Sequence, residues 1–414
     1  MYHFSNTKHN CTYLKIIISN HLYILYIQTK RVKFVSRIGK NINHILNKKK
    51  MAKKVFSKVL WATIACMALL SSCEKEEENR DRERNTDERY SCLIINQGNY
   101  SESNGSISII NKEDKIENQV YKESNGEPLA SIIESAVDCG STWALLCNNE
   151  DKVEIIDKVT FKTKATIKGI PTPRYGVVRK GYLYVTSVTA WDGSNGFVYQ
   201  IDLSNNTIKE KVEVTGIPEG IIAQYNSLWV TSTVYGSAPS VSRIEPDKEM
   251  KVTAYPYTGT EAGLEAKHLA VDKNGTIWVS LSAYASTSGV AAIDTAKKEI
   301  SALNALDGFI YSGHIYASKA GDKLYYMTGS GSGAADDVTT IKTFDVKSKE
   351  VATIVKGNGF YGFGIAPDGE IYTANVYGFT SNSTLQIYDS RGTKINGDDE
   401  LVGVGACRFL FPKW

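Results

Sequence analysis

Two histidines, His268 and His314, are the residues whose type and spacing best suit acid–base or metal chemistry. They stand 46 residues apart, at equivalent points of a repeat that organises the chain. With Glu219 or Glu265 they could bind a metal or act as acid and base. The sequence contains no phosphate loop, nucleophile elbow or Cys/His zinc spacing. We therefore predict a protein that is not an enzyme and requires no metal or cofactor. A hydrolase or lyase that uses the two histidines is the alternative.

Aromatic residues on glycine- and serine-rich stretches provide a second kind of candidate site. They are Tyr100, Trp191, Tyr235, Tyr284, Tyr377 and Phe379. A further group lies between the repeats: Arg174, Tyr175, Lys267, His268, Tyr311, His314, Tyr361 and Arg408, with Glu219, Phe309 and Phe360 beside them. Aromatic rings offer contact area at low entropic cost, and polar groups fix a ligand's orientation. The combination predicts a recognition surface for a large, partly planar or sugar-like ligand, or for a protein.

A repeat of two strand motifs must position these residues. The first motif is a short apolar strand that opens toward Thr, Ser or Asn, as in Leu183–Thr186 and Leu228–Thr231, and it occurs seven times. The second ends at Asn111, Asp157, Asp202, Glu245, Asp294, Asp345 and Asp389, with separations of 46, 45, 43, 49, 51 and 44 residues. Seven copies at this spacing predict an all-β, seven-bladed β-propeller with four-stranded blades.

The order of strands within one copy supports this fold. In blade 3 we expect strands at Gly176–Val178, Tyr182–Ser187, Gly196–Asp202 and Thr207–Val214, separated by turn sequences. The loops after the second strands share one face of a propeller with the connections between blades. That face therefore gathers the candidate residues, whereas short turns such as Asp368–Gly369 close the opposite face.

Closure of the ring follows from the first and last strands. The first copy begins at its second strand, so we expect Gly403–Phe411 to supply the missing innermost strand of blade 1. In this antiparallel register Cys92 and Cys407 lie at opposite ends of the blade, which argues against a bridge between them. The disulfide state of Cys139 and Cys147 stays open.

Charge is distributed unevenly along the chain. Residues 1–72 carry 13 Lys or Arg and no Asp or Glu, which leaves 35 basic and 45 acidic residues in the remainder, a net charge of −10. An acidic domain has no electrostatic basis for binding nucleic acid, so we exclude that partner class.

The start of the chain reads as a leader. We interpret residues 1–50 as a mis-called upstream segment and 51–72 as a signal peptide, with Lys53, Lys54 and Lys58 ahead of the apolar run Val59–Leu70. Leu70-Ser71-Ser72-Cys73 resembles the lipobox of bacterial lipoproteins, which implies lipidation of Cys73. Residues 73–90 form a charged tether, and an ordinary membrane anchor is disfavoured because the apolar run is too short.

The opening of the predicted propeller, residues 91–414, carries a wider resemblance. Ile94-Ile95-Asn96-Gln97-Gly98-Asn99-Tyr100, followed by Asn104–Ser108, resembles the first blade of the surface-lipoprotein propellers of Bacteroidota, which are related to YVTN-repeat proteins. The acidic run Glu74–Glu78 after Cys73 is similar to their export signal. The resemblance implies a protein anchored to the outer membrane by lipid alone and facing the cell exterior.

The same resemblance implies a role. Some members capture cobalamin for a TonB-dependent outer-membrane transporter, so we expect a nutrient-capture protein with cobalamin as the leading small-molecule ligand. An adhesion or protein-interaction propeller is a further alternative. Two blades depart from the pattern, because Asn148–Asp151 in blade 2 and Gly329–Gly333 in blade 6 lack long aromatic loops. No ligand-contacting residue is therefore transferred from the family.

Overall fold

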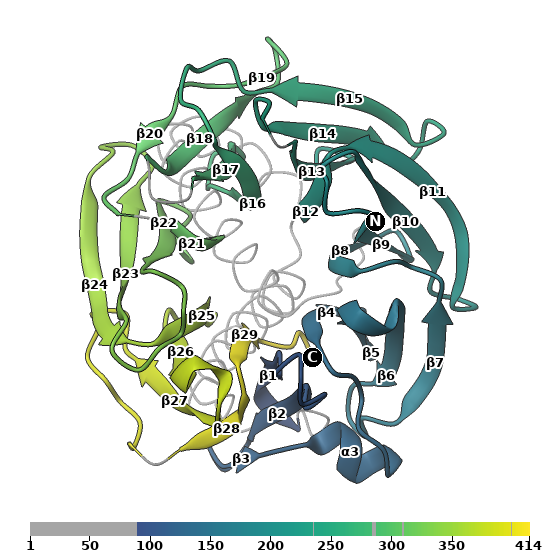
Figure 1. Ribbon diagram of the computed structural model, residues 1–414, viewed down its shortest axis with the longest axis vertical. Helices are drawn as coiled ribbons and strands as arrows, with labels where there is room; N and C mark the ends of the chain where they lie inside the picture. The colour runs from purple at the N-terminus through teal and green to yellow at the C-terminus, as the bar shows by residue number, and fades with distance from the viewer. Residues whose placement is uncertain (1–88, 235, 284–286, 309, 399) are drawn as a thin grey trace, which may run out of the picture. The chain divides into compact units, whose positions relative to one another are not determined.

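The computed structural model describes residues 89–234, 236–283, 287–308, 310–398 and 400–414. The chain divides into two compact units, Met1–Arg84 and Asn85–Trp414, and the described residues belong to the second. In this unit seven antiparallel sheets surround a central axis (Figure 1). The predicted seven-bladed β-propeller is confirmed.

Each blade places its first strand beside the axis and its last at the outer edge (Figure 1). Blade 1 contains β29 (Ala406–Leu410), β1 (Tyr90–Asn96), β2 (Ser106–Asn111) and β3 (Ile116–Glu117). Blade 2 contains β4 (Ile133–Asp138), β5 (Thr142–Cys147), β6 (Lys152–Asp157) and β7 (Thr163–Lys168). Blade 3 contains β8 (Pro173–Arg179), β9 (Tyr182–Val188), β10 (Asn195–Asp202) and β11 (Thr207–Thr215). Blade 4 contains β12 (Ile217–Gln224), β13 (Ser227–Thr233), β14 (Ser240–Glu245) and β15 (Lys251–Pro256).

The remaining blades follow the same order. Blade 5 contains β16 (Glu265–Val271), β17 (Ile277–Ser282), β18 (Gly289–Asp294) and β19 (Glu299–Ile300), and β20 (Asn304–Ala305) also pairs with β18. Blade 6 contains β21 (Ile310–Ala317), β22 (Lys323–Thr328), β23 (Val338–Asp345) and β24 (Val351–Asn358). Blade 7 contains β25 (Phe360–Ile365), β26 (Ile371–Asn375), β27 (Asn382–Tyr388) and β28 (Leu401–Val404).

The core lies between neighbouring blades. Every residue of β17 is buried, because both faces of this second strand meet an adjacent sheet. Trp229 and Tyr255 of blade 4 pack edge to face at 5.0 Å and share a buried cluster with Leu281 of blade 5. Each fully buried side chain of this size contributes roughly 1.5–3 kcal/mol. A single sheet would expose these apolar faces, so the ring stabilises every blade.

The C-terminal strand closes the ring, as predicted. β29 pairs antiparallel with β1, with Ile94 opposite Phe409. One detail of the prediction is wrong, because Gly403 and Val404 belong to β28 and pair with blade 7. The chain turns between the two sheets at Gly405, whose φ of +69° suits glycine. The unit from Asn85 onward thus contains every pairing that its own ring requires, and we expect it to fold by itself.

Lys413 and Trp414, which follow β29, connect the closed blade 1 to blade 2. Trp414 packs edge to face on Tyr90 at 5.2 Å. The buried ammonium of Lys158 donates to the Lys413 carbonyl at 2.9 Å and to Asp138 at 2.7 Å. A buried cation with two acceptors holds the tail more firmly than an exposed pair would.

Helix is rare in the described part of the chain. α3 (Val120–Asn125) lies in the connection from blade 1 to blade 2, and 3₁₀ turns occur at Asn148–Glu150 and Tyr377–Phe379. Among the described residues, no helix has the length and apolar character needed to cross a membrane. The predicted leader, Cys73 and the tether up to residue 88 lie outside the described residues.

Candidate functional site

The inner strands of all seven described blades carry an irregularity at the same place. Pairing with the second strand skips Glu134, Arg174–Tyr175, Glu219–Gly220, Lys267–His268, residues 311–314, Tyr361–Gly362 and Cys407. A β-bulge adds residues to one strand and re-aims their side chains. Here the bulges bring polar residues from successive blades to the central axis.

Hydroxyl groups on the second strands hold these bulges. In blade 3 the Tyr175 amide donates to Thr186 Oγ1 at 3.0 Å, and this hydroxyl donates to the Glu219 carbonyl of blade 4 at 2.9 Å. In blade 4, Thr231 Oγ1 donates to the Lys267 carbonyl of blade 5 at 2.7 Å. The Thr or Ser that ends the repeated sequence motif therefore links one bulge to the next.

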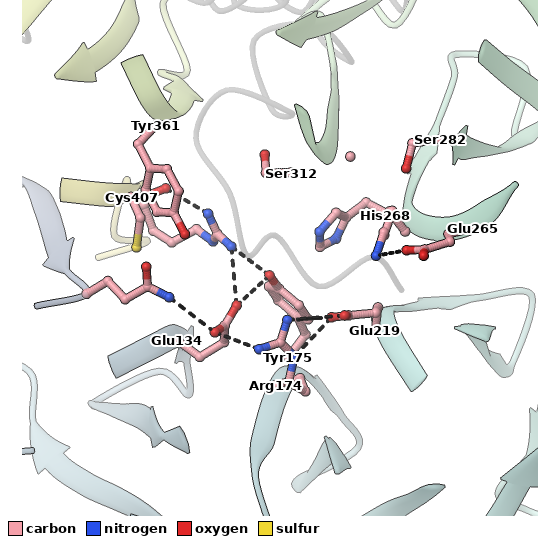
Figure 2. A pocket seen from close by; sticks show the side chains of 14 residues that line it. Glu134, Arg174, Tyr175, Glu219, Glu265, His268, Ser282, Ser312, Tyr361 and Cys407 are labelled. Carbon is pink, nitrogen blue, oxygen red and sulfur yellow. Dashed lines mark hydrogen bonds and ion pairs between the residues drawn. The ribbon is translucent and has the colours of Figure 1, made fainter. Parts of the chain in front are cut away.

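A buried ionic network occupies one side of the axis (Figure 2). The Arg174 guanidinium donates to both carboxylate oxygens of Glu219, at 3.0 and 3.1 Å, and to Glu134 at 2.8 Å. The Tyr175 hydroxyl donates to Glu134 at 2.8 Å and accepts a hydrogen bond from Arg408 at 2.6 Å. Four neighbouring inner strands, β29, β4, β8 and β12, supply these groups.

The charges in this network largely compensate one another. Burial opposes the charge of Arg174, but Glu134 and Glu219 outweigh it and raise the pKa of the guanidinium. Burial raises the pKa of the Tyr175 hydroxyl well above its usual range, so it stays neutral. On the opposite side, Lys267 pairs with Glu265. The polar wall therefore presents paired charges and not a single sign.

The two histidines meet beside this network. The His268 and His314 rings have centroids 3.6 Å apart, and His268 packs edge to face on Tyr175 at 4.6 Å. Burial, with Arg408 as the next cause, lowers the pKa of each imidazole well below its usual range, so both are neutral at pH 7. The described residues contain no group of three or more His, Cys, Asp or Glu arranged to hold a metal.

Three cavities surround these residues. The funnel, of about 390 Å³, is the axial cavity whose wall includes Glu134, Arg174, Glu219 and Lys267. A lower cavity of about 200 Å³ continues along the axis, and the two share a floor made of Tyr175, His268 and Arg408. The aromatic shoulder, of about 540 Å³, is lined by Tyr100, Trp191 and Phe379 with Asn148 and Asn149.

Residues 90–399 match the family described as "Domain of unknown function (DUF5074)". The chain belongs to this family. Comparison with curated proteins finds no match.

Solved structures resemble this DUF5074 protein in fold. A quinonprotein alcohol dehydrogenase-like protein from Bacteroides thetaiotaomicron has a TM-score of 0.55 at 13% identity, over 79% of each chain. A protein from Lactobacillus plantarum has a TM-score of 0.57 at 17% identity, over 78% of this chain and 99% of its own. A functionally unknown protein from Desulfotomaculum acetoxidans has a TM-score of 0.55 at 12% identity, over 78% of this chain and 100% of its own. At such identities the likeness concerns the propeller alone.

The structure brings most predicted site residues of the DUF5074 protein together. Arg174, Tyr175, Lys267, His268, Tyr361 and Arg408 line the funnel, and His314 lines the lower cavity. Tyr100, Trp191 and Phe379 line the shoulder. Tyr377 lines neither, because its hydroxyl bonds Thr384 at 2.9 Å. Tyr235, Tyr284, Phe309 and the Tyr311 side chain lie outside the described residues, whereas Phe360 is fully buried between blades 6 and 7.

Sequence reasoning missed several lining residues. Glu134, Gln97 and Ser312 line the funnel, and Asn148 and Asn149 place the short blade 2 loop in the shoulder. Glu134 carried a usable signal, because it is an acid inside an apolar strand at the position that Arg174 occupies in the next blade. No feature of the sequence marks Asn148 and Asn149 as lining residues, because their place in the shoulder depends on the shape of the rim.

Proposed function

We propose that this protein is a non-catalytic capture protein that binds a nutrient at the rim of the funnel. The observation that supports binding is the preformed funnel with the aromatic shoulder beside it. Because Arg174, Glu134 and Glu219 satisfy one another, the polar wall is ordered before a ligand arrives. Preorganisation of this kind lowers the entropic cost of binding.

The cellular setting of this proposal rests on the leader. Lipidation of Cys73 would anchor the protein to the outer membrane, and the acidic run Glu74–Glu78 supports display on the cell exterior. A propeller tethered there would hand its ligand to a TonB-dependent transporter. The anchor is then the protein's one contact with the lipid phase.

Cobalamin is our leading ligand, with an oligosaccharide as the second. A corrinoid is large, roughly flat and edged with amides that donate and accept hydrogen bonds. The funnel and the shoulder share Gln97, Glu134 and Arg174, and their combined volume falls near the upper end of the ~300–1,000 Å³ that ligand sites commonly have. The exposed Trp191 ring, 5.4 Å from the Arg174 guanidinium, offers a face for stacking. Paired charges suit an amide-rich ligand better than an ion.

Calorimetry of residues 85–414 with cobalamin tests this proposal. Saturable heat is expected, and Trp191→Ala should weaken binding by about 2 kcal/mol if this ring is an anchor. Tyr225→Ala is the matched control, because Tyr225 is an exposed aromatic in the turn between β12 and β13 that bonds Gly275. If cobalamin, haem and a glycan panel all give no heat at micromolar protein, the small-ligand proposal fails and a protein partner replaces it.

The histidine pair supports a second candidate, a hydrolase or lyase. His268 lines both axial cavities, and its ring contacts that of His314, so a neutral base is accessible from the funnel. Turnover of an ester and lactone panel, lost in His268→Ala and retained in Trp191→Ala, would favour this candidate over capture.

A further inference from the structure

Three buried polar atoms without partners belong to residues that line the funnel or the lower cavity. Ser312 Oγ, Arg408 Nε and His314 Nε2 make no hydrogen bond within the described structure. Arg408 is 8% exposed and His314 is 4% exposed. Ser312 and Arg408 line the funnel, whereas Arg408 and His314 line the lower cavity. Buried polar groups nearly always have a partner, so a cluster of three indicates a place where a polar group binds.

Arg408 is less closely matched by carboxylates than Arg174 is. Arg174 is matched by two carboxylates in short hydrogen bonds, but Arg408 has only Glu134 at 3.6 Å and otherwise bonds neutral oxygens. Arg408 and Arg174 both depress the pKa of each histidine, and no carboxylate is among the causes that oppose them. The least compensated cation of the axis therefore faces two neutral imidazoles.

We propose that the floor of the funnel is a binding subsite for a single carboxylate group, formed by Arg408, Ser312, His268 and His314. The guanidinium supplies the charge, and the serine hydroxyl and an imidazole N–H supply further donors. Figure 2 shows Ser312 and His268 around the same central space, opposite Glu134.

A carboxylate fits this subsite better than a phosphate does. A monoanion matches the single charge of Arg408, whereas a second negative charge has no cation left to pair with, because Arg174 is already bonded to Glu134 and Glu219. The lower cavity, of about 200 Å³, has room for a small planar group. Arg408, Ser312, His268 and His314 do not line the aromatic shoulder, so binding of a small carboxylate at the floor can be tested apart from the larger ligand proposed for funnel and shoulder.

Histidine NMR provides a direct test. His268 and His314 are the only histidines of residues 85–414, so ¹⁵N-histidine labelling reports on this floor alone. At pH 7.5 and constant ionic strength, replacing chloride by acetate should produce a saturable shift of both ring signals with a millimolar Kd. Arg408→Lys and Ser312→Gly should each raise that Kd at least fivefold. Glycine suits the φ of +53° at Ser312, so this variant is expected to fold even if Arg408→Lys does not.

The control substitution removes a buried hydroxyl that lies away from the floor of the funnel. Tyr326 Oη is another buried hydroxyl without a partner, and Tyr326→Phe should leave the acetate Kd unchanged. An acetate shift that never saturates, a Kd that Ser312→Gly does not alter, or tighter binding of inorganic phosphate would each overturn the proposal. Acetate binding that survives Trp191→Ala while cobalamin gives no heat would reject nutrient capture and keep the subsite.

Discussion

At the scale of single residues, the Glu134 carboxylate holds the side chains of the funnel wall together. Its carboxylate accepts hydrogen bonds from Arg174 and Tyr175, both at 2.8 Å, and lies 3.6 Å from Arg408. One buried acid of blade 2 therefore joins two residues of blade 3 to one residue of blade 1. Isolated burial of any of these charges would be costly, so the network persists only because its members are mutually satisfied.

The histidine pair makes stability depend on pH. Folding lowers the pKa of both imidazoles, so below about pH 6.5 the unfolded chain binds protons that the folded chain does not. Their contribution is fully present above that pH and is lost as pH falls, at up to about 1.4 kcal/mol per pH unit per histidine. We expect His314→Phe to reduce this slope between pH 7.5 and 5.5, measured by urea unfolding. An unchanged slope would mean that folding does not lower the pKa of His314.

The sequence predicted which residues converge, but not how they pair. Equivalent positions of the repeat were sufficient to bring Arg174, His268 and Arg408 to one axis. The hydrogen bonds from Arg174 to Glu134 and Glu219 depend on the bulges, which turn neighbouring side chains in different directions. Periodicity does not encode those directions, so the pairing of Arg174 with Glu134 could not be predicted even though the position of Glu134 in the repeat could.

At the scale of elements, a hydroxyl on the second strand of blades 3, 4 and 5 links each of these blades to the next one. We expect Thr231→Val to destabilise the protein by about 1–3 kcal/mol, because it leaves the Lys267 carbonyl without its donor. Thr233→Val is the matched control on the same strand, since its buried hydroxyl has no partner and its loss should be nearly neutral. Chemical denaturation measures both. Equal effects of the two substitutions would remove the linking role.

The closing strand gives a second test at this scale. Deleting Cys407–Trp414 removes β29, exposes the edge of β1 and removes the buried Phe409, which contributes roughly 1.5–3 kcal/mol. We predict an insoluble or protease-sensitive product. Deleting only residues 412–414 should have a smaller effect, because the strand pairing remains. A full deletion that melts like the parent would show that the ring closes without β29.

Strand positions were predictable because recognisable turn sequences separate the strands along the chain. The expected strands of blade 3 differ from β8–β11 by at most three residues at any end. The boundary at Gly405 was missed, since Val404 and Ala406 are both apolar and a turn between sheets leaves no clear periodic signal. α3 was missed because the long connection before blade 2 carries little apolar repeat.

At the scale of the whole molecule, residues 1–72 are basic and the rest of the chain is acidic. A net charge of −10 beyond residue 72 steers no anion toward the funnel, so Arg408 acts on a ligand only after it has entered. Under our proposals, selectivity would come from the floor and the aromatic shoulder, and the leader would set the location of the protein.

The location is tested at Cys73, which lies outside the described residues. If this cysteine carries the lipid, Cys73→Ala should leave an unprocessed precursor that no longer incorporates a fatty-acid probe. Cys66→Ala is the matched control, because Cys66 lies within the predicted signal peptide and should not alter labelling. If the protein is displayed on the cell exterior, as we propose, protease added to intact cells should then degrade the labelled wild-type protein. Complete protection, with an intact outer membrane, would place the protein in the periplasm and remove surface capture, whereas labelling of the Cys73→Ala protein would remove the anchor itself.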